Sequence, residues 1–109
     1  MKIEKSLLSG STPMLVLSLL KDGDKYGYQM VTELARRSND TFDLKEGTLY
    51  PLLHAMEKEG WVTSYDQKTD GGRARKYYRL TGAGKKRLEY KQEEWRVFSK
   101  TVDAVLSCC

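Results

Sequence analysis

The chain has 109 residues, enough for one small domain, and 39% of them are hydrophobic and 31% charged, which is typical of a globular rather than a disordered protein. Nineteen Lys and Arg residues against fifteen Asp and Glu residues give a net charge of +4, which permits an acidic partner without naming one. No apolar run approaches the length of a membrane span, and residues 1–11 lack the long apolar stretch that directs export. We therefore expect a cytoplasmic protein with no membrane partner.

The sequence contains no pattern typical of a catalytic or metal site. Its single histidine, His54, argues against histidine-based zinc sites and against most nucleophile–base pairs. Cys108 and Cys109 are adjacent, so they cannot bridge the fold without strain. We expect them in a frayed tail of a reduced protein, with a crosslinking role as the alternative. These residues predict neither an enzyme nor a bound cofactor or metal.

Two helices and a short strand are predicted in the first 45 residues. The hydroxyl residues and proline at 11–13 favour a helix start. Residues 14–20 are apolar nearly all round, so this helix is expected to be buried on more than one side, in its own core or against a second subunit. A second helix is predicted over residues 24–38, with Asp24 as a possible cap. Alternating apolar and polar residues at 41–44 predict a very short strand.

The third predicted helix has the clearest pattern. One apolar stripe is formed by Leu49, Leu52, Leu53 and Met56. Because Pro51 is tolerated only in a first turn, the helix is expected to begin between Glu46 and Thr48, and Gly60 is a natural stop. At about 100° per residue, the face away from the stripe presents Gly47, Tyr50, Pro51, His54 and Lys58.

Residues 61–80 predict a basic β-hairpin. The runs at 61–65 and 75–80 are rich in strand-forming residues, and the paired glycines Gly71 and Gly72 favour a turn between them. The hairpin contains two acidic residues and five basic ones, which are Lys68, Arg73, Arg75, Lys76 and Arg79.

Thr81 is predicted to cap a long last helix with a narrow apolar seam. The seam has a heptad spacing and consists of Leu88, Trp95, Phe98, Val102 and Val105. A long helix of this kind favours a second helix as partner, so we expect a homodimer through these five residues. The expected division is a DNA-binding domain at 1–80 and a dimerisation helix at 81–109.

This order of elements predicts a fold that is mainly α with a small β-hairpin, a winged helix-turn-helix followed by a C-terminal dimerisation helix. In that architecture the third helix enters the DNA major groove and the hairpin follows the backbone. The basic hairpin would neutralise phosphates, and Gly71 and Gly72 would let its tip approach closely. Tyr50, His54 and Lys58 are available for base edges or phosphates. A symmetric dimer predicts a pseudo-palindromic operator in double-stranded DNA.

Three strings resemble the PadR family of bacterial transcriptional regulators: YGYQM at 26–30, EGTLYPLLHAMEKEGWV at 46–62 and GGRARKYYRLTGAG at 71–84. The length is similar to that of the shorter branch, with a single C-terminal dimerisation helix. The resemblance implies a homodimeric DNA-binding regulator, most often a repressor. It also implies that seven residues lie at or near the DNA, namely Tyr26, Thr48, Tyr50, Pro51, Gly72, Arg73 and Lys76.

The resemblance further implies relief of repression by a flat aromatic or multidrug-like effector between the subunits, with Trp95 and Leu15 as ligand-binding residues. One departure is Ala55 before Met56, where many members have a basic residue. This departure makes the operator less predictable.

Several roles stay open from the residues alone. Tyr50 either contacts phosphate or covers the end of the first helix, and His54 either reads a base or lies idle at the surface. Tyr26 either caps the second helix against the hairpin or binds a phosphate. Trp95 either stacks on an effector or anchors a dimer core, whereas Tyr78 is expected in the core. The alternative function is a protein–protein interaction module, since fold does not fix function.

Overall fold

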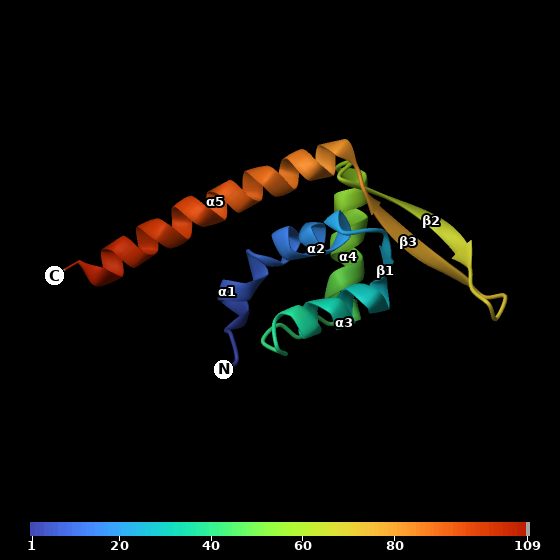
Figure 1. The fold of residues 1–109 in the computed structure, drawn as a ribbon, viewed down its shortest axis with the longest axis horizontal. Helices are drawn as coiled ribbons and strands as arrows, with labels where there is room; N and C mark the ends of the chain where they lie inside the picture. The colour runs from blue at the N-terminus through green and yellow to red at the C-terminus, as the bar shows by residue number, and fades with distance from the viewer. Residues whose placement is uncertain (109) are drawn as a thin grey trace.

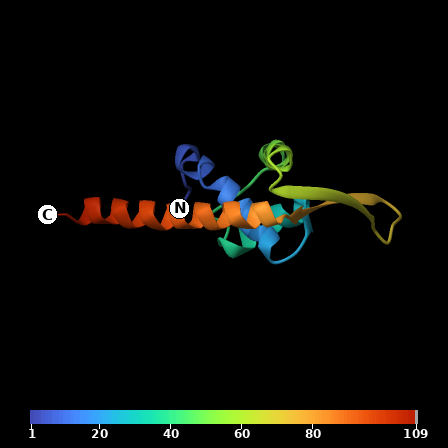
Figure 2. The same ribbon diagram turned by 90° about the horizontal axis from the view of Figure 1, so that it is seen from above.

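The computed structural model describes residues 1–108 as a small helical body from which a helix and a hairpin project in opposite directions (Figures 1 and 2). Its dimensions are 62 × 30 × 21 Å. The elements are α1 (Lys5–Ser9), α2 (Thr12–Lys21), β1 (Lys25–Tyr26), α3 (Gly27–Arg37), α4 (Glu46–Lys58), β2 (Val62–Lys68), β3 (Ala74–Leu80) and α5 (Gly82–Ser107). The predicted fold class, mainly helical with a small hairpin, is confirmed. α1 was not predicted.

One hydrophobic core joins the helices to the sheet. The apolar helix α2 lies at its centre, with Val16 and Leu17 fully buried. The stripe of α4 faces this core as predicted, because Leu49, Leu53 and Met56 are buried. The prediction for Tyr78 is also confirmed, since only 1% of its surface is exposed. These contacts fix the orientation of α4, and therefore which of its faces remains outside.

The sheet has three antiparallel strands in the order β1-β3-β2. The two-residue strand β1 was not predicted, and the strand predicted at 41–44 is wrong, because that segment contains no strand. Leu44 and Phe42 pack against the core from irregular backbone. Asn39 and Asp40 turn the chain with positive φ values of 49° and 62°.

The second helix begins later than predicted. α3 starts at Gly27, and Tyr26, not Asp24, occupies the N-cap position. The backbone N–H of Tyr26 donates to Gln29 Oε1 at 3.0 Å, which satisfies one donor at the helix start. The side chain of Asp24 is bonded to the hairpin instead.

Helix α4 begins at Glu46, within the predicted range, but Pro51 lies in its second turn rather than its first. Proline cannot donate to the carbonyl four residues back, which here belongs to Gly47. Gly47 is exposed in the structure. Gly60, with φ of +81°, follows the helix and ends it as predicted.

Thr81 caps α5 as predicted: its Oγ1 accepts from the N–H of Gly84 at 2.9 Å and donates to the Gly60 carbonyl at 2.6 Å. Gly84 is required by a close approach, because a Cβ there would lie 2.0 Å from the carbonyl oxygen of Trp61. This approach fixes the start of α5 against the chain that follows α4.

Leu88 was assigned wrongly to the dimer seam. Only 2% of its surface is exposed, and it packs into the core of its own chain. Trp95, Phe98 and Val105, farther along α5, are 46%, 55% and 69% exposed. The apolar face open to a partner therefore begins beyond Leu88.

Within residues 1–108, no helix is both long and apolar enough to cross a membrane. The same residues contain no cluster of His, Cys, Asp and Glu that could hold a metal ion. Cys108 follows the end of α5 and is exposed, whereas Cys109 lies outside the described residues.

Candidate nucleic-acid interface

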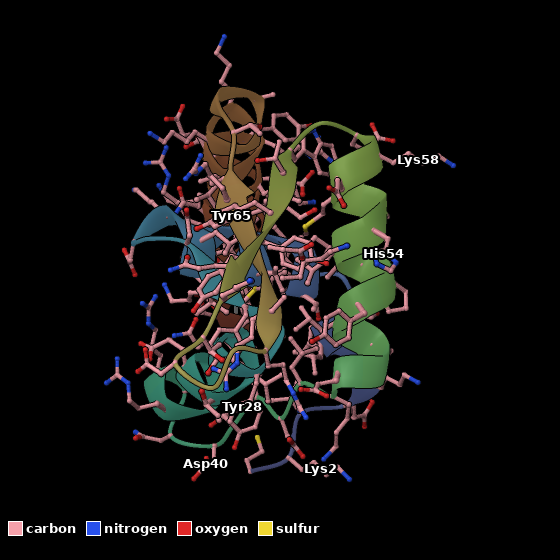
Figure 3. All side chains as sticks on the ribbon, turned by 90° about the vertical axis from the view of Figure 1, so that its right-hand side faces the viewer. Lys2, Tyr28, Asp40, His54, Lys58 and Tyr65 are labelled. Carbon is pink, nitrogen blue, oxygen red and sulfur yellow. The ribbon has the colours of Figure 1, made fainter. Side chains whose placement is uncertain are left out.

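The outer face of α4 is exposed along its length. Thr48, Pro51, His54 and Lys58 are all exposed, and Figure 3 shows Lys58 extending outward from α4, on the side away from the hairpin. Ser64 of β2 donates to Glu57 of α4 through a 2.6 Å hydrogen bond. This bond connects the helix to the hairpin, so the two elements are held together.

The hairpin formed by β2, β3 and their turn, here called the wing, carries a row of unpaired cations. Arg73, Arg75 and Lys76 are exposed, and no carboxylate of residues 1–108 lies within ion-pair distance of any of them. The turn closes through hydrogen bonds from Thr69 N–H to the Arg73 carbonyl and from Gly72 N–H to the Thr69 carbonyl, both 2.9 Å. Gly72 has φ of +78°, which favours glycine.

The wing, α3 and α4 meet at a concavity of about 490 Å³. Its lining residues are Tyr26, Tyr28, Glu46, Tyr50, Arg75 and Lys76. The Arg75 guanidinium lies over the Tyr26 ring, 4.5 Å from its centre. The structure therefore brings together four of the predicted site residues, Tyr26, Tyr50, Arg75 and Lys76. Arg73 at the tip and His54 and Lys58 on α4 lie outside this concavity.

The Tyr50 ring lies against the start of α3. A Cβ at Gly27 would lie 2.3 Å from the Tyr50 hydroxyl, so Gly27 makes room for the ring. Burial, and then the charge of Glu46, raises the pKa of Tyr50. A tyrosine hydroxyl is protonated at neutral pH even at its ordinary pKa, so it can donate a hydrogen bond to an anion.

Sequence reasoning missed the residues at the base of the wing. Asp24 Oδ2 accepts from the Tyr65 hydroxyl at 2.7 Å and from Arg79 Nε at 3.1 Å. The hydrogen bond to Asp24, followed by burial, raises the pKa of Tyr65. The Tyr77 ring stacks on Tyr65 at 5.7 Å and meets the edge of Tyr26 at 5.4 Å. No local sequence signal identifies this cluster, because its members come together only when β1 pairs with the wing.

A second concavity lies between α5 and the N-terminal helices α1 and α2. It has a volume of about 440 Å³ and is lined by Ser6, Leu7, Gly10, Ser11, Met14, Lys91, Glu94, Trp95 and Phe98. Trp95, one of the two residues predicted to bind a ligand, is part of this lining. Leu15, the other predicted ligand-binding residue, is not in this lining; it is half-buried and packs against the core. Its neighbour Met14 lines the concavity instead.

Helices α2, α3 and α4 form a body in which the exposed helix α4 stands beside a cationic hairpin. This arrangement defines a winged helix-turn-helix protein. The profile of the PadR-like family of transcriptional regulators matches residues 16–90. The chain therefore belongs to the PadR-like family, whose members are regulators and not enzymes.

Solved structures support this membership over nearly the whole chain. A transcriptional regulator from Clostridium thermocellum superposes with a TM-score of 0.85 at 33% identity, covering 93% of this chain and 95% of that one. A PadR family regulator from Clostridium difficile gives a TM-score of 0.76 at 38% identity, covering 89% and 99% of the two chains. The transcriptional regulator Rv3488 of Mycobacterium tuberculosis is 37% identical over 73 residues, which are 67% of this chain and 64% of that protein.

Proposed function

We propose that this regulator is a homodimeric DNA-binding repressor that uses α4 and the wing to bind a pseudo-palindromic operator. The observation that supports this most strongly is the row of exposed wing cations without carboxylate partners, next to a concavity rich in tyrosine hydroxyls. Lys and Arg on a hairpin neutralise phosphates, and tyrosine hydroxyls donate to them. As a protein that binds chromosomal DNA, it would act in the cytoplasm.

The chemistry of the interface divides between its two parts. Arg73, Arg75 and Lys76 would contact the DNA backbone and supply affinity without sequence preference. The outer face of α4 would contact base edges, with Thr48 and His54 as hydrogen-bonding residues and Pro51 available for the thymine methyl group. Lys58 would bind a phosphate at the far end of the helix.

The dimer is supported by the exposed apolar surface of α5. The C-terminal part of α5 extends away from the body (Figure 1). Trp95, Phe98 and Val105 are exposed on this helix and Val102 is half-exposed, and an apolar surface of this kind favours association. Two copies joined there would present two α4 helices to successive major grooves.

A flat aromatic effector would bind in the α1–α2–α5 concavity beside Trp95. The apolar side chains of Leu7, Met14 and Phe98 line it together with the indole, and aromatic rings stack favourably on one another. Because the cavity borders the dimer face of α5, a ligand there would alter the spacing of the two DNA-binding units and release the operator.

Selection of duplexes from a random-sequence library, followed by gel shifts, tests this function. The wild-type chain should enrich duplexes with an inverted repeat, and Arg73→Ala should weaken their binding. Lys100→Ala removes the same charge from the distal half of α5 and serves as the matched control. Failure to enrich any duplex, or equal effects of the two substitutions, would favour the protein–protein interaction module instead.

A further inference from the structure

Asp24 joins both strands of the wing to the body of the protein through one oxygen atom. The hydroxyl of Tyr65 on β2 and the guanidinium of Arg79 on β3 both donate to Asp24 Oδ2, at 2.7 and 3.1 Å. The Arg79 guanidinium also lies over the Tyr65 ring, 5.1 Å from its centre. The two donors are therefore held by each other as well as by the carboxylate.

The backbone alone holds the wing weakly. β1 has two residues, which pair as Lys25 with Tyr78 and Tyr26 with Tyr77, whereas β2 and β3 have seven residues each. The outer part of the wing projects beyond these pairs, away from the body (Figure 1). Besides the core packing of Val62 and Tyr78 and the Ser64–Glu57 hydrogen bond, the two bonds to Asp24 therefore add a side-chain attachment at the end of the short β1 ladder.

The body side of the attachment is fixed. Lys25, next to Asp24, is half-buried, and its Nζ donates to the carbonyl of Leu19 in the last turn of α2 at 2.7 Å. Leu19 is part of the core. Asp24 is thus anchored to the core through its neighbour, and through it the wing is anchored as well.

The geometry of the wing makes its angle important for binding. Six residues of extended chain separate Arg79 from Arg73, which amounts to about 20 Å. A swing of about 10° at the base would move the tip by roughly 3 Å, and a hydrogen bond to phosphate does not survive such a displacement.

We propose that Asp24 is a positioning residue that holds the wing at the angle at which Arg73, Arg75 and Lys76 reach the DNA backbone. This inference rests on the proposed function, because it concerns contacts between the wing and DNA. According to this proposal, Asp24 strengthens DNA binding, although the repulsion between its negative charge and the DNA phosphates would by itself weaken binding.

The sign of the effect provides the test, with Asp22→Ala as the matched control for Asp24→Ala. Asp22 is paired with Arg37 of α3 and makes no hydrogen bond to the wing. Each substitution removes one negative charge, so general electrostatics predicts that both raise affinity for a duplex selected by the wild-type chain. Positioning predicts that Asp24→Ala lowers the affinity by about tenfold, whereas Asp22→Ala leaves it unchanged or raises it. Asp24→Asn keeps an acceptor oxygen and should restore most of the binding.

A double-mutant cycle separates positioning from a general loss of stability. If Asp24 acts through the wing, Asp24→Ala should weaken binding little further once Arg73 and Lys76 are replaced by Ala. Independent losses, or no loss on Asp24→Ala, would overturn the inference and leave the proposed function intact. No DNA binding by the wild-type chain would overturn the proposed function.

Amide hydrogen exchange of the DNA-free protein tests the attachment by itself. Asp24→Ala should speed exchange in β2 and β3 but not in α4, because the wing would open without unfolding the core. Unchanged exchange in the wing would show that Asp24 does not restrain it.

Discussion

Replacing Gly84 with alanine should strongly destabilise the protein, although alanine favours helices. The added Cβ would lie 2.0 Å from the Trp61 carbonyl oxygen, where ordinary contact begins at 3.4 Å. That oxygen already accepts from the N–H of Thr81 at 3.1 Å, so the junction would have to open and break the bond. Overpacking costs typically 1–3 kcal/mol and a broken hydrogen bond about 1 kcal/mol, which gives a net loss of about 2–4 kcal/mol.

Gly82→Ala is the matched control, since it makes the same change in the same first turn of α5. A Cβ at Gly82 would meet nothing within 4 Å, so this variant should gain about 0.4–1 kcal/mol through reduced freedom of the unfolded chain. Urea unfolding followed by circular dichroism, at one protein concentration because association would shift the midpoint, measures both. A Gly84→Ala variant as stable as the wild type would refute the close approach.

Three further predictions concern the core, pH dependence and the α5 surface. Leu53→Ala should cost about 2–5 kcal/mol in the same urea assay, because the side chain is fully buried; a near-neutral result would contradict the assigned core. Hydrogen bonds from Arg36, and then from Arg37, lower the pKa of Glu33 from 4.5 to about 2. Ionised Glu33 therefore stabilises the fold above pH 4.5, and this contribution is lost as the pH falls toward 2. The Tm of Glu33→Gln should fall less than that of the wild type over this range, and parallel Tm curves would disprove the pairing. Phe98→Asp should convert dimers to monomers in sedimentation velocity, and a monomeric wild type would rule out the proposed dimer.

The sequence predicted α4, the wing and the cap of α5 because each rests on a local pattern. The apolar stripe of α4 repeats within two turns, and Thr81 acts on a donor three residues away. The outer face of α4 followed directly from that stripe. The fold class and the exposed cations of the candidate interface were therefore predictable.

Contacts between distant segments were not predictable in this way. β1 is a strand only because it pairs with Tyr77 and Tyr78, so Asp24 looked like a helix cap rather than an attachment for the wing. The alternation at Phe42 and Leu44 reflects one-sided burial in irregular chain and not a strand. The heptad spacing of α5 could not distinguish packing against the same chain from packing against a second chain. Leu88 was therefore assigned to the dimer seam, although it packs into the core of its own chain.

The salt dependence of DNA affinity tests most directly whether the wing neutralises phosphates. A duplex selected by the wild-type chain should be titrated over a range of salt concentrations with the wild type and with the Arg73→Ala/Lys76→Ala variant. If both cations bind phosphates, the slope of log affinity against log salt should become shallower by about 0.9 for each phosphate that the variant no longer neutralises. Equal slopes for the two proteins would contradict the account.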